Sequence, residues 1–351
     1  MSAPRLRLGI AGLGFAGRLV VDALETDDRV AIVAGADPAA DARRTFAART
    51  GATVHPDVGR MCRDPGLDAV WVATPTRFHR EHTEAAAEAG HDVIVDKPMA
   101  PSVADCDAMI AAAAKAGTRL LAGGVRSLDP AFAAMREVVE SGAIGRLCHV
   151  TATAYTGWLR RDRSPAEMDE ALGGGLVFNQ APHQVDTIRM LAGARAVRGV
   201  RAATAAWSDT GNAIGHYRAE IEFEDDLTAV LAYDGHGYLR SADLVAPGGA
   251  LSFVLADVGL VVASGSRGAV RPAGDHLQLV TDEGPRVVPV RQGNATTEAI
   301  SELLAARDPA APPPRHAGGW GRDTLEIVAA LAESARTGAR VDLRARKGKG
   351  T

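Results

Sequence analysis

Three glycines near the start of the chain have the spacing Gly-x-Gly-x-x-Gly and directly follow the apolar run Leu6–Ala11. The residues of this glycine turn are Gly12, Leu13, Gly14, Phe15, Ala16 and Gly17. Between a strand and a helix, the first glycine allows a tight turn, the second lets the backbone approach a pyrophosphate, and the third allows close packing of helix and strand. The helix N-terminus then faces the anion. The pattern therefore predicts a dinucleotide-binding turn; the alternative is a glycine-rich surface turn without a ligand.

An acidic residue stands where this kind of turn needs one. Asp37 comes twenty positions after Gly17, at the end of the apolar run Val30–Ala36. A carboxylate at this place bonds the ribose hydroxyls of the dinucleotide and repels a 2'-phosphate, which favours NAD. NADP stays open as an alternative because Arg43 and Arg44 follow and can bind a phosphate, although both also fit a solvated helix face.

Two polar stretches end later apolar runs. Thr74, Pro75 and His79 follow one of these runs, and Asp96 and Lys97 end the next. In open parallel sheets, ligands bind outside the carboxyl ends of the strands, so both stretches belong to the ligand-binding edge. Lys97 is therefore a candidate acid or base; the alternative is an ordinary solvated lysine at a strand end.

The elements that must position these residues alternate in the way that a parallel sheet requires. Short apolar runs are followed by stretches of helical period from residue 6 to residue 124. The predicted strands are Leu6–Ala11, Val30–Asp37, Thr53–Val54, Ala69–Thr74, Asp92–Asp96 and Arg119–Gly123. The clearest helices are Phe78–Ala89 and Ser102–Ala116, which end at Gly90 and Gly117. We expect an α/β domain over residues 1–125, with the doubly wound parallel sheet of a Rossmann fold.

The rhythm changes beyond Asp129. Helices are predicted at Pro130–Ser141, Gln180–Ala192, Thr297–Ala306 and Arg322–Thr337, and strands at Leu147–Tyr155, Val197–Ala206, His216–Phe223, Thr228–Tyr233, Ala242–Val245, Leu251–Leu255 and Val287–Val290. Alternating runs of this kind indicate an open, mostly antiparallel sheet, with the last run at its edge because Pro289 cannot donate to a ladder. We expect an α+β domain over residues 126–345, with a functional loop in the polar segment that ends at Glu170.

Composition limits the classes of protein to consider. A chain of 351 residues favours two domains. Its net charge of -4 offers no general attraction for nucleic acid or an anionic membrane. Cys62, Cys106 and Cys148 lack the spacing of a disulfide framework or a zinc site. Arg18 and Asp22 interrupt the first apolar segment, and no run approaches the ~20 residues of a membrane span. We expect a soluble cytoplasmic protein that binds a small molecule and neither nucleic acid nor membrane.

At this point the chain resembles the Gfo/Idh/MocA family of nicotinamide-dependent oxidoreductases. The resemblance covers nearly the whole chain and rests on the glycine turn, the Thr-Pro-x-x-x-His stretch, an Asp-Lys-Pro variant of a Glu-Lys-Pro motif, the glycines 173–175 and the segment 179–186. It implies that the backbone of Thr74 and Pro75 lines the cofactor, as do Asp96 and Lys97, and that His79 borders the nicotinamide; the alternative for His79 is a polar residue at a helix start.

The same resemblance implies that Lys97 and His183 form the catalytic pair. The family commonly has an aspartate four residues before this histidine, but Asn179 stands there, and Asp186 follows three residues after it. Either Lys97 or His183 can take the hydroxyl proton during hydride transfer, and the sequence does not decide between them. Family members commonly dimerise through the open sheet, so we expect a homodimer or homotetramer.

Segments 155–160, 175–184 and 320–321 look most like the branch that contains phthalate dihydrodiol dehydrogenases. The substrate expected from this branch is a cis-dihydrodiol of an aromatic carboxylate. Arginines suit a carboxylate, so the substrate candidates are Arg126, Trp158 as a pocket wall, Arg160, Asn179, His183 and Asp186, with Arg161 and Arg163 as further arginines. The alternative for each arginine is ordinary solvated charge, and Trp158 also suits plain packing.

Other functions stay open. A sugar or inositol dehydrogenase or reductase is the commonest activity in the family. Two other classes are a non-catalytic dinucleotide sensor and an NAD-dependent glycosidase. His236 and Tyr238 suit either the substrate face or a plain surface, and His79 and His82 have helical spacing for a metal but no third ligand, so no metal is predicted.

Overall fold

The computed structural model describes residues 5–160, 162–206, 214–238, 240–241 and 259–344. The chain forms two compact units. Unit 1 comprises Met1–Val125, Ala171–Gly173 and Asn294–Leu325, and unit 2 comprises Arg126–Glu170, Gly174–Gly293 and Glu326–Thr351. The functional division expected from the sequence, residues 1–125 for the cofactor and 126–345 for substrate and assembly, stays a prediction.

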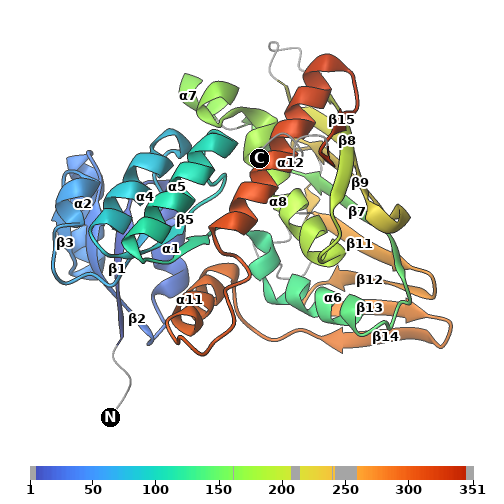
Figure 1. The fold of residues 1–351 in the computed structure, drawn as a ribbon, viewed down its shortest axis with the longest axis horizontal. Helices are drawn as coiled ribbons and strands as arrows, with labels where there is room; N and C mark the ends of the chain where they lie inside the picture. Colours follow the sequence, from blue (N-terminus) through green and yellow to red (C-terminus); the bar gives the residue numbers. More distant parts are fainter. Residues whose placement is uncertain (1–4, 161, 207–213, 239, 242–258, 345–351) are drawn as a thin grey trace. The chain divides into compact units, whose positions relative to one another are not determined.

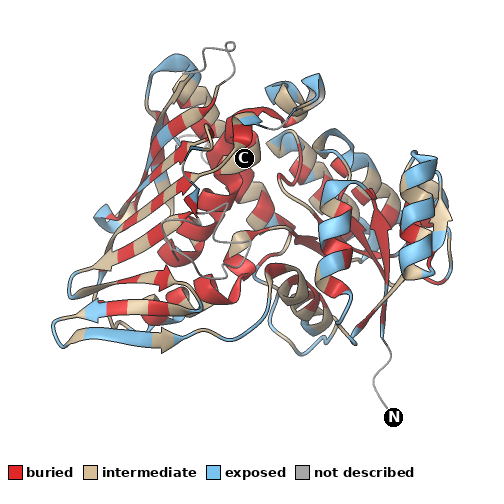
Figure 2. Ribbon diagram, turned by 180° about the vertical axis from the view of Figure 1, so that it is seen from behind, coloured by how far each residue is buried: buried red, intermediate tan, exposed pale blue. Residues whose placement is uncertain are grey.

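Unit 1 is built on a six-stranded parallel sheet with the strand order β3-β2-β1-β4-β5-β6 (Figure 1). The strands are β1 (Leu6–Ala11), β2 (Val30–Ala36), β3 (Thr53–His55), β4 (Ala69–Val72), β5 (Asp92–Val95) and β6 (Leu120–Ala122). The helices are α1 (Phe15–Leu24), α2 (Ala40–Thr50), α3 (Val58–Met61), η1 (Thr76–Phe78), α4 (His79–Glu88), α5 (Val103–Ala116) and α11 (Ala295–Ala306). Every residue of β4 and β5 is buried, as Figure 2 shows, because parallel strands are covered on both faces.

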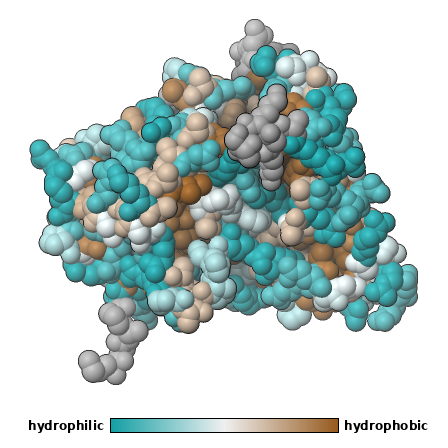
Figure 3. Space-filling model, viewed as in Figure 1, coloured by the Kyte–Doolittle hydropathy of each residue, from teal (hydrophilic) through white to brown (hydrophobic). Residues whose placement is uncertain are grey.

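Local signals in the sequence set the helix ends of this unit. Helix α5 begins after Ser102, whose side chain accepts a hydrogen bond from the Asp105 N–H, and ends at Gly117, which has a φ of +70°. A hydroxyl at the start and a left-handed glycine at the end satisfy backbone groups that the helix leaves unpaired. Helix α2 buries only Phe46, and hydrophilic residues lie along the outer side of unit 1 near α2 in Figure 3.

Unit 2 is built on a nine-stranded mixed sheet with the order β14-β13-β12-β11-β7-β10-β9-β8-β15, in which only the β7–β10 pair is parallel. The strands are β7 (Leu147–Tyr155), β8 (Val197–Ala205), β9 (His216–Phe223), β10 (Thr228–Asp234), β11 (Leu260–Gly265), β12 (Gly268–Ala273), β13 (His276–Thr281), β14 (Gly284–Pro289) and β15 (Val341–Asp342). In β9, Tyr217, Ala219, Ile221 and Phe223 are buried and their neighbours are not, so one face of the sheet carries the core.

Three short helices, η3 (Trp158–Arg160), α7 (Pro165–Met168) and η4 (Glu170–Leu172), form the polar segment for which the sequence predicts a functional loop. The other helices described beyond residue 125, apart from α11, are η2 (Arg126–Leu128), α6 (Pro130–Glu140), α8 (Gly175–Ala192), η5 (Glu224–Asp226) and α12 (Gly318–Thr337). None of the described helices has the length and apolar character to cross a membrane.

The predicted fold class is confirmed, and several elements differ in detail: α12 begins at Gly318, four residues before its predicted start, and β15 was not predicted. Helix α8 begins at Gly175, five residues before the predicted start, although Gly174 and Pro182 favour other structures. Strands β11, β12 and β13 were not predicted, because short runs bounded by glycines gain their order from cross-strand pairing. The expected strands 242–245 and 251–255 lie outside the described residues. Strand β14, which contains Pro289, is an edge strand as predicted.

Candidate functional site

The glycine turn in unit 1 depends on the absence of side chains at two positions. Gly12 has a φ of +89°, and a Cβ added there would lie 2.7 Å from the carbonyl oxygen of Ala73. A Cβ on Gly17 would overlap the carbonyl oxygen of Gly12. At Gly14, the N-cap of α1, an added Cβ would meet no heavy atom within 4 Å. The turn is therefore tight against the protein and open at the helix N-terminus, which fits the approach of a pyrophosphate.

The Asp37 side chain is hydrogen-bonded to the backbone of the glycine turn. Its Oδ2 accepts a hydrogen bond from the Leu13 N–H at 2.9 Å, and its Oδ1 accepts from the Ala39 N–H at 2.8 Å. A carboxylate has about four acceptor positions, so both oxygens can still accept from ribose hydroxyls. The structure thus places the predicted acid beside the glycine turn, and its oxygens suit the hydroxyl donors of a ribose.

The two nearby arginines differ in their contacts. Arg43 Nη1 donates to the backbone carbonyls of Asp37 at 2.6 Å and Pro38 at 2.9 Å. Arg44 is exposed and forms an ion pair with Asp41. Arg43 is therefore held at the turn that carries Asp37, whereas Arg44 has its own acidic partner.

His79 joins the loops that follow β4 and β5. It is 1% exposed, its Nε2 lies 2.7 Å from the Thr74 carbonyl oxygen, and its Nδ1 lies 3.0 Å from the Pro98 and 3.2 Å from the Met99 carbonyl oxygen. Burial lowers the pKa of His79, although the nearby Asp96 and the three carbonyls act in the opposite direction. Both ring nitrogens face backbone carbonyls, so in this structure the His79 side chain holds two strand ends together.

The remaining predicted cofactor residues surround these loops. The backbone N of Thr74 would lie 2.8 Å from a Cβ on Gly12, so this loop lies directly against the glycine turn. Lys97 is half-buried, and its N–H donates to Asp96 Oδ1 at 2.7 Å. Phe15 is 58% exposed at the first position of α1; Ala16 is half-buried and Pro75 is exposed. The structure thus gathers the predicted cofactor residues at the carboxyl ends of β1, β2, β4 and β5.

Helix α8 carries the predicted proton-transfer residue of unit 2. His183 is 3% exposed, and Asn179, four residues earlier, lies on the same side of the helix. Asn179 accepts a hydrogen bond from the Gln180 side chain at 2.8 Å. An amide in place of the family aspartate carries no charge, so Asn179 cannot serve as a carboxylate base.

Gln184, which sequence reasoning missed, fixes α8 on the sheet. Its Nε2 donates to the carbonyls of Ala152 in β7 at 2.9 Å and Ala232 in β10 at 3.0 Å, and its Oε1 accepts from the Tyr217 hydroxyl at 2.6 Å. Because these three bonds fix the helix, they also fix the direction of the adjacent His183. No local signal in the sequence distinguishes Gln184 from its polar neighbours His183 and Asp186.

Asp186 makes a contact that the sequence does not predict. Its Oδ2 accepts from the Ser127 N–H at 2.7 Å and its Oδ1 from the Ser127 hydroxyl at 2.8 Å. Both residues are at most 2% exposed. Ser127 follows Arg126 in η2, so Asp186 ties the helix of His183 to the turn that carries Arg126. Binding of the substrate by Asp186, as expected from the sequence, stays a prediction.

The segment after β7 contains the aromatic and basic candidates. Trp158 is 2% exposed, and the guanidinium of Arg163 lies 3.2 Å from the centre of its ring. Arg163 also pairs with Glu167 at 3.6 Å. Arg160 is exposed and donates from Nε to the His236 carbonyl at 2.7 Å. Trp158 is thus a packing residue in this structure, and Arg161 lies outside the described residues.

Comparison with known proteins places this geometry in a family. A model described as an oxidoreductase family with an NAD-binding Rossmann fold matches residues 6–123, and a model of the GFO/IDH/MocA C-terminal domain matches residues 132–270. A solved protein of Bordetella bronchiseptica RB50 is 30% identical, with a TM-score of 0.89, and the match covers 97% of this chain and 100% of that one. The chain belongs to the Gfo/Idh/MocA oxidoreductase family. The predicted resemblance and the predicted nicotinamide-dinucleotide-binding fold are confirmed.

Relatives within the Gfo/Idh/MocA family carry different names. One from Comamonas testosteroni, named 1-carboxy-3-chloro-3,4-dihydroxycyclohexa-1,5-diene dehydrogenase, is 37% identical over 68% of this chain and 60% of its own length. A myo-inositol 2-dehydrogenase from Thermotoga maritima is 30% identical over 54% of this chain and 55% of its own length. The chain therefore matches less than two thirds of each of these two relatives. An Agrobacterium radiobacter oxidoreductase solved with NAD+, L-tartaric acid and magnesium shares the fold at 20% identity and a TM-score of 0.80, over 98% of this chain and 100% of that one.

The described part of this Gfo/Idh/MocA chain holds no group of three or more His, Cys, Asp or Glu side chains placed to bind a metal. His79 and His82, which have helical spacing, are both used elsewhere. His82 Nδ1 lies 2.9 Å from the Thr74 hydroxyl, and His79 contacts the backbone carbonyls described above.

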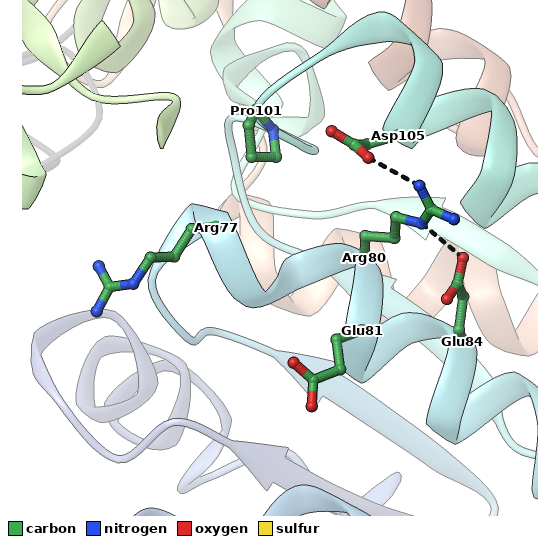
Figure 4. Close-up of a pocket in the computed structure, with 6 residues that line it drawn as sticks. All are labelled: Arg77, Arg80, Glu81, Glu84, Pro101 and Asp105. Carbon is green, nitrogen blue, oxygen red and sulfur yellow. Dashed lines mark hydrogen bonds and ion pairs between the residues drawn. The ribbon is translucent and has the colours of Figure 1, made fainter. Parts of the chain in front are cut away.

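Figure 4 shows a small surface cavity of about 220 Å³ beside α4 and α5. Its lining residues are Arg77, Arg80, Glu81, Glu84, Pro101 and Asp105. Arg80 donates to Glu84 at 2.8 Å and to Asp105 at 3.1 Å, whereas Arg77 points away from this pair. The charges within the cavity largely neutralise one another, and none of the predicted cofactor or substrate residues lines it.

Proposed function

We propose that the protein is an NAD-dependent dehydrogenase that oxidises a cyclic alcohol, with a cis-dihydrodiol of an aromatic carboxylate as its substrate. The observation that carries the proposal is the glycine turn with the Asp37 carboxylate bonded across it to the Leu13 N–H. In this proposal the turn shaped by Gly12, Gly14 and Gly17 binds the pyrophosphate at the N-terminus of α1, and Asp37 binds the ribose. When bound, the nicotinamide accepts a hydride from the carbinol carbon.

NAD is favoured over NADP by charge. In this proposal the carboxylate of Asp37 binds the ribose hydroxyls, and it would repel a 2'-phosphate as a like charge. Arg43 donates to two backbone carbonyls beside Asp37, and Arg44 pairs with Asp41. Both arginines therefore already have partners within the protein, which further favours NAD.

The residues of the chain supply the proton chemistry. As the carbonyl forms, the substrate hydroxyl must lose its proton to a base within hydrogen-bond reach. Lys97 and His183 are the candidates for this base, and a histidine needs little adjustment to accept a proton near neutral pH. Gln184 supports the role of His183 because its three hydrogen bonds fix the helix on which His183 stands.

The substrate proposal rests on likeness to the Comamonas testosteroni relative, whose name describes a carboxylated dihydroxycyclohexadiene. Oxidation of a cis-dihydrodiol carboxylate that carries hydrogen on both carbinol carbons gives a catechol, with the hydride passing to NAD and a proton released, and aromatisation favours this direction. The myo-inositol 2-dehydrogenase relative supports a second candidate, an inositol or sugar dehydrogenase, which differs only in the cyclic alcohol.

We also propose that the protein acts in the cytoplasm and assembles as a homodimer or homotetramer through the nine-stranded sheet. Val230 in β10 and Val280 in β13 support the assembly because both are more than 40% exposed. Isolated large apolar groups are normal on surfaces, but several on one sheet favour an interface.

The test is the absorbance of NADH formed by the purified protein with NAD or NADP and a panel of cis-dihydrodiol carboxylates, inositols and aldoses. The proposal expects NADH with a dihydrodiol carboxylate and NAD. Turnover of inositols or sugars, without turnover of any dihydrodiol carboxylate, would favour the inositol or sugar dehydrogenase over the proposed substrate. Binding of NADH without turnover of any alcohol would favour a dinucleotide sensor, and release of a sugar without accumulated NADH would favour an NAD-dependent glycosidase.

A further inference from the structure

Arg160 lies between two loops at the carboxyl ends of two central strands, β7 and β10, of the sheet in unit 2. It ends η3, which follows β7, and it contacts the loop that follows β10. Because β7 and β10 are parallel neighbours, their carboxyl ends meet at the same edge of the sheet. The side chain of Arg160 crosses from one loop to the other and donates from Nε to the His236 carbonyl at 2.7 Å.

The exposed ring of Tyr238 lies against the guanidinium of Arg160, and Gly237 leaves room for its side chain. The central carbon of the guanidinium lies 4.7 Å from the centre of the Tyr238 ring, a distance typical of a cation–π contact. Gly237 has a φ of +75°, and a Cβ there would lie 2.9 Å from both Cδ and Nε of Arg160. Any side chain at position 237 would therefore displace the arginine.

The loop that receives Arg160 is itself fixed. The His236 N–H donates to Asp234 Oδ1 at 2.8 Å, and His236 Nδ1 lies 3.0 Å from the same oxygen. Gly235 lies against the turn after β7, since a Cβ on it would be 2.8 Å from Cβ of Trp158. The carbonyl of His236 is thus presented to Arg160 by a loop with a defined conformation.

The bond from Nε to the His236 carbonyl leaves the other two guanidinium nitrogens of Arg160 available within the described part of the chain. Among the described residues, Nη1 and Nη2 of Arg160 have no hydrogen-bond partner. Arg163, three residues later, differs because it stacks on Trp158 and pairs with Glu167. The two terminal nitrogens of an arginine form a planar fork that matches the two oxygens of a carboxylate, and the charge persists at all physiological pH values.

We propose that Arg160 binds the carboxylate of the substrate and thereby determines specificity for acidic cyclic diols. This inference rests on the proposed function, because it assigns one residue to one group of the proposed substrate. Nε holds the side chain to the His236 carbonyl, Tyr238 supports the guanidinium plane, and Nη1 and Nη2 receive the carboxylate.

The experiment measures binding of benzoate and of uncharged benzamide to the complex of the full-length protein with NADH, by calorimetry. The variants are Arg160→Ala, Arg160→Lys and Gly237→Ala, with Arg201→Ala as a control that removes one exposed arginine from β8. Arg160→Lys keeps the charge without the fork, and Gly237→Ala keeps the arginine but moves it. Melting temperatures identify any variant that fails to fold.

The inference expects that wild type prefers benzoate and that Arg160→Ala lowers the ratio of benzoate to benzamide affinity by about 10- to 100-fold. Arg160→Lys and Gly237→Ala should lower it by less, and Arg201→Ala should leave it unchanged. An unchanged ratio in Arg160→Ala, or no benzoate binding by wild type, would overturn the inference. Benzoate binding that depends on Arg160, without oxidation of any dihydrodiol carboxylate, would reject the proposed substrate and keep the anion site.

Discussion

Asp37 contributes two hydrogen bonds to the fold, and we propose that its charge also determines the choice of cofactor. Its carboxylate accepts from the backbone of Leu13 and Ala39, so it shapes the glycine turn, and in our proposal the same carboxylate excludes a 2'-phosphate. Replacement of Asp37 by asparagine removes the charge and keeps one side-chain oxygen that can accept a hydrogen bond.

We predict that Asp37→Asn raises the ratio of kcat/KM with NADP to that with NAD by about tenfold or more, because a like charge no longer faces the phosphate. Arg43, which donates to the Asp37 carbonyl, would then attract the 2'-phosphate without an opposing carboxylate beside it. The measurement is steady-state kinetics with both cofactors, and Asp28→Asn, an exposed position, is the control. A ratio that stays at the wild-type value would contradict the assignment of Asp37 to the ribose.

Lys97 is the second residue whose role can be isolated. We predict that Lys97→Ala lowers kcat by about 10²- to 10⁴-fold, because a positioned acid or base is lost, while NADH binding stays nearly intact. Turnover and NADH fluorescence titration measure the two effects, with Lys115→Ala on the exposed end of α5 as the matched control. Normal turnover in Lys97→Ala would leave His183 as the sole candidate base.

Among the elements, α8 and η2 show how a buried carboxylate can position two functional segments. Asp186 stands three residues after His183 and bonds both donors of Ser127, the neighbour of Arg126. A buried acceptor of this kind stabilises the fold, whereas a residue that binds substrate affects mainly KM.

We predict that Asp186→Asn destabilises the protein by about 1–3 kcal/mol, because hydrogen bonds from Ser127 to a charged carboxylate are stronger than those to a neutral amide. Ser127→Ala removes only the hydroxyl bond and should have a smaller effect. Thermal unfolding measures the stability, and kinetics measure KM. An unchanged melting temperature with a raised KM would instead support direct binding of substrate by Asp186.

The sequence predicted the elements whose signals are local. The glycine turn, β1, β7 and the cap of α5 depend on neighbouring residues, so they were predicted within a residue or two. Strand β12 was missed because Gly268 and Pro272 weaken a strand signal, and its order comes from pairing with β11 and β13. The Ser127–Asp186 contact joins residues 59 positions apart, and no local pattern in the sequence indicates it.

The assembly that we propose for the whole molecule uses the nine-stranded sheet. Val230 is 42% exposed, while its neighbours Ala229 and Leu231 are buried, so Val230 lies on the face opposite the core. We predict that Val230→Glu converts the oligomer to smaller species, because a charge in an apolar interface must be desolvated. Light scattering after size exclusion measures the mass, with Arg44→Glu on α2 as the control. A wild-type monomer, or an unchanged mass in Val230→Glu, would contradict assembly through this face.

The proposed reaction is net hydride transfer from a carboxylated cis-dihydrodiol to NAD. It can be followed with this substrate carrying deuterium on both carbinol carbons, by mass spectrometry of the cofactor. We expect deuterium in the NADH that accumulates, at one equivalent for each catechol formed. Catechol without labelled NADH, or no product from a protein that binds NADH, would contradict it.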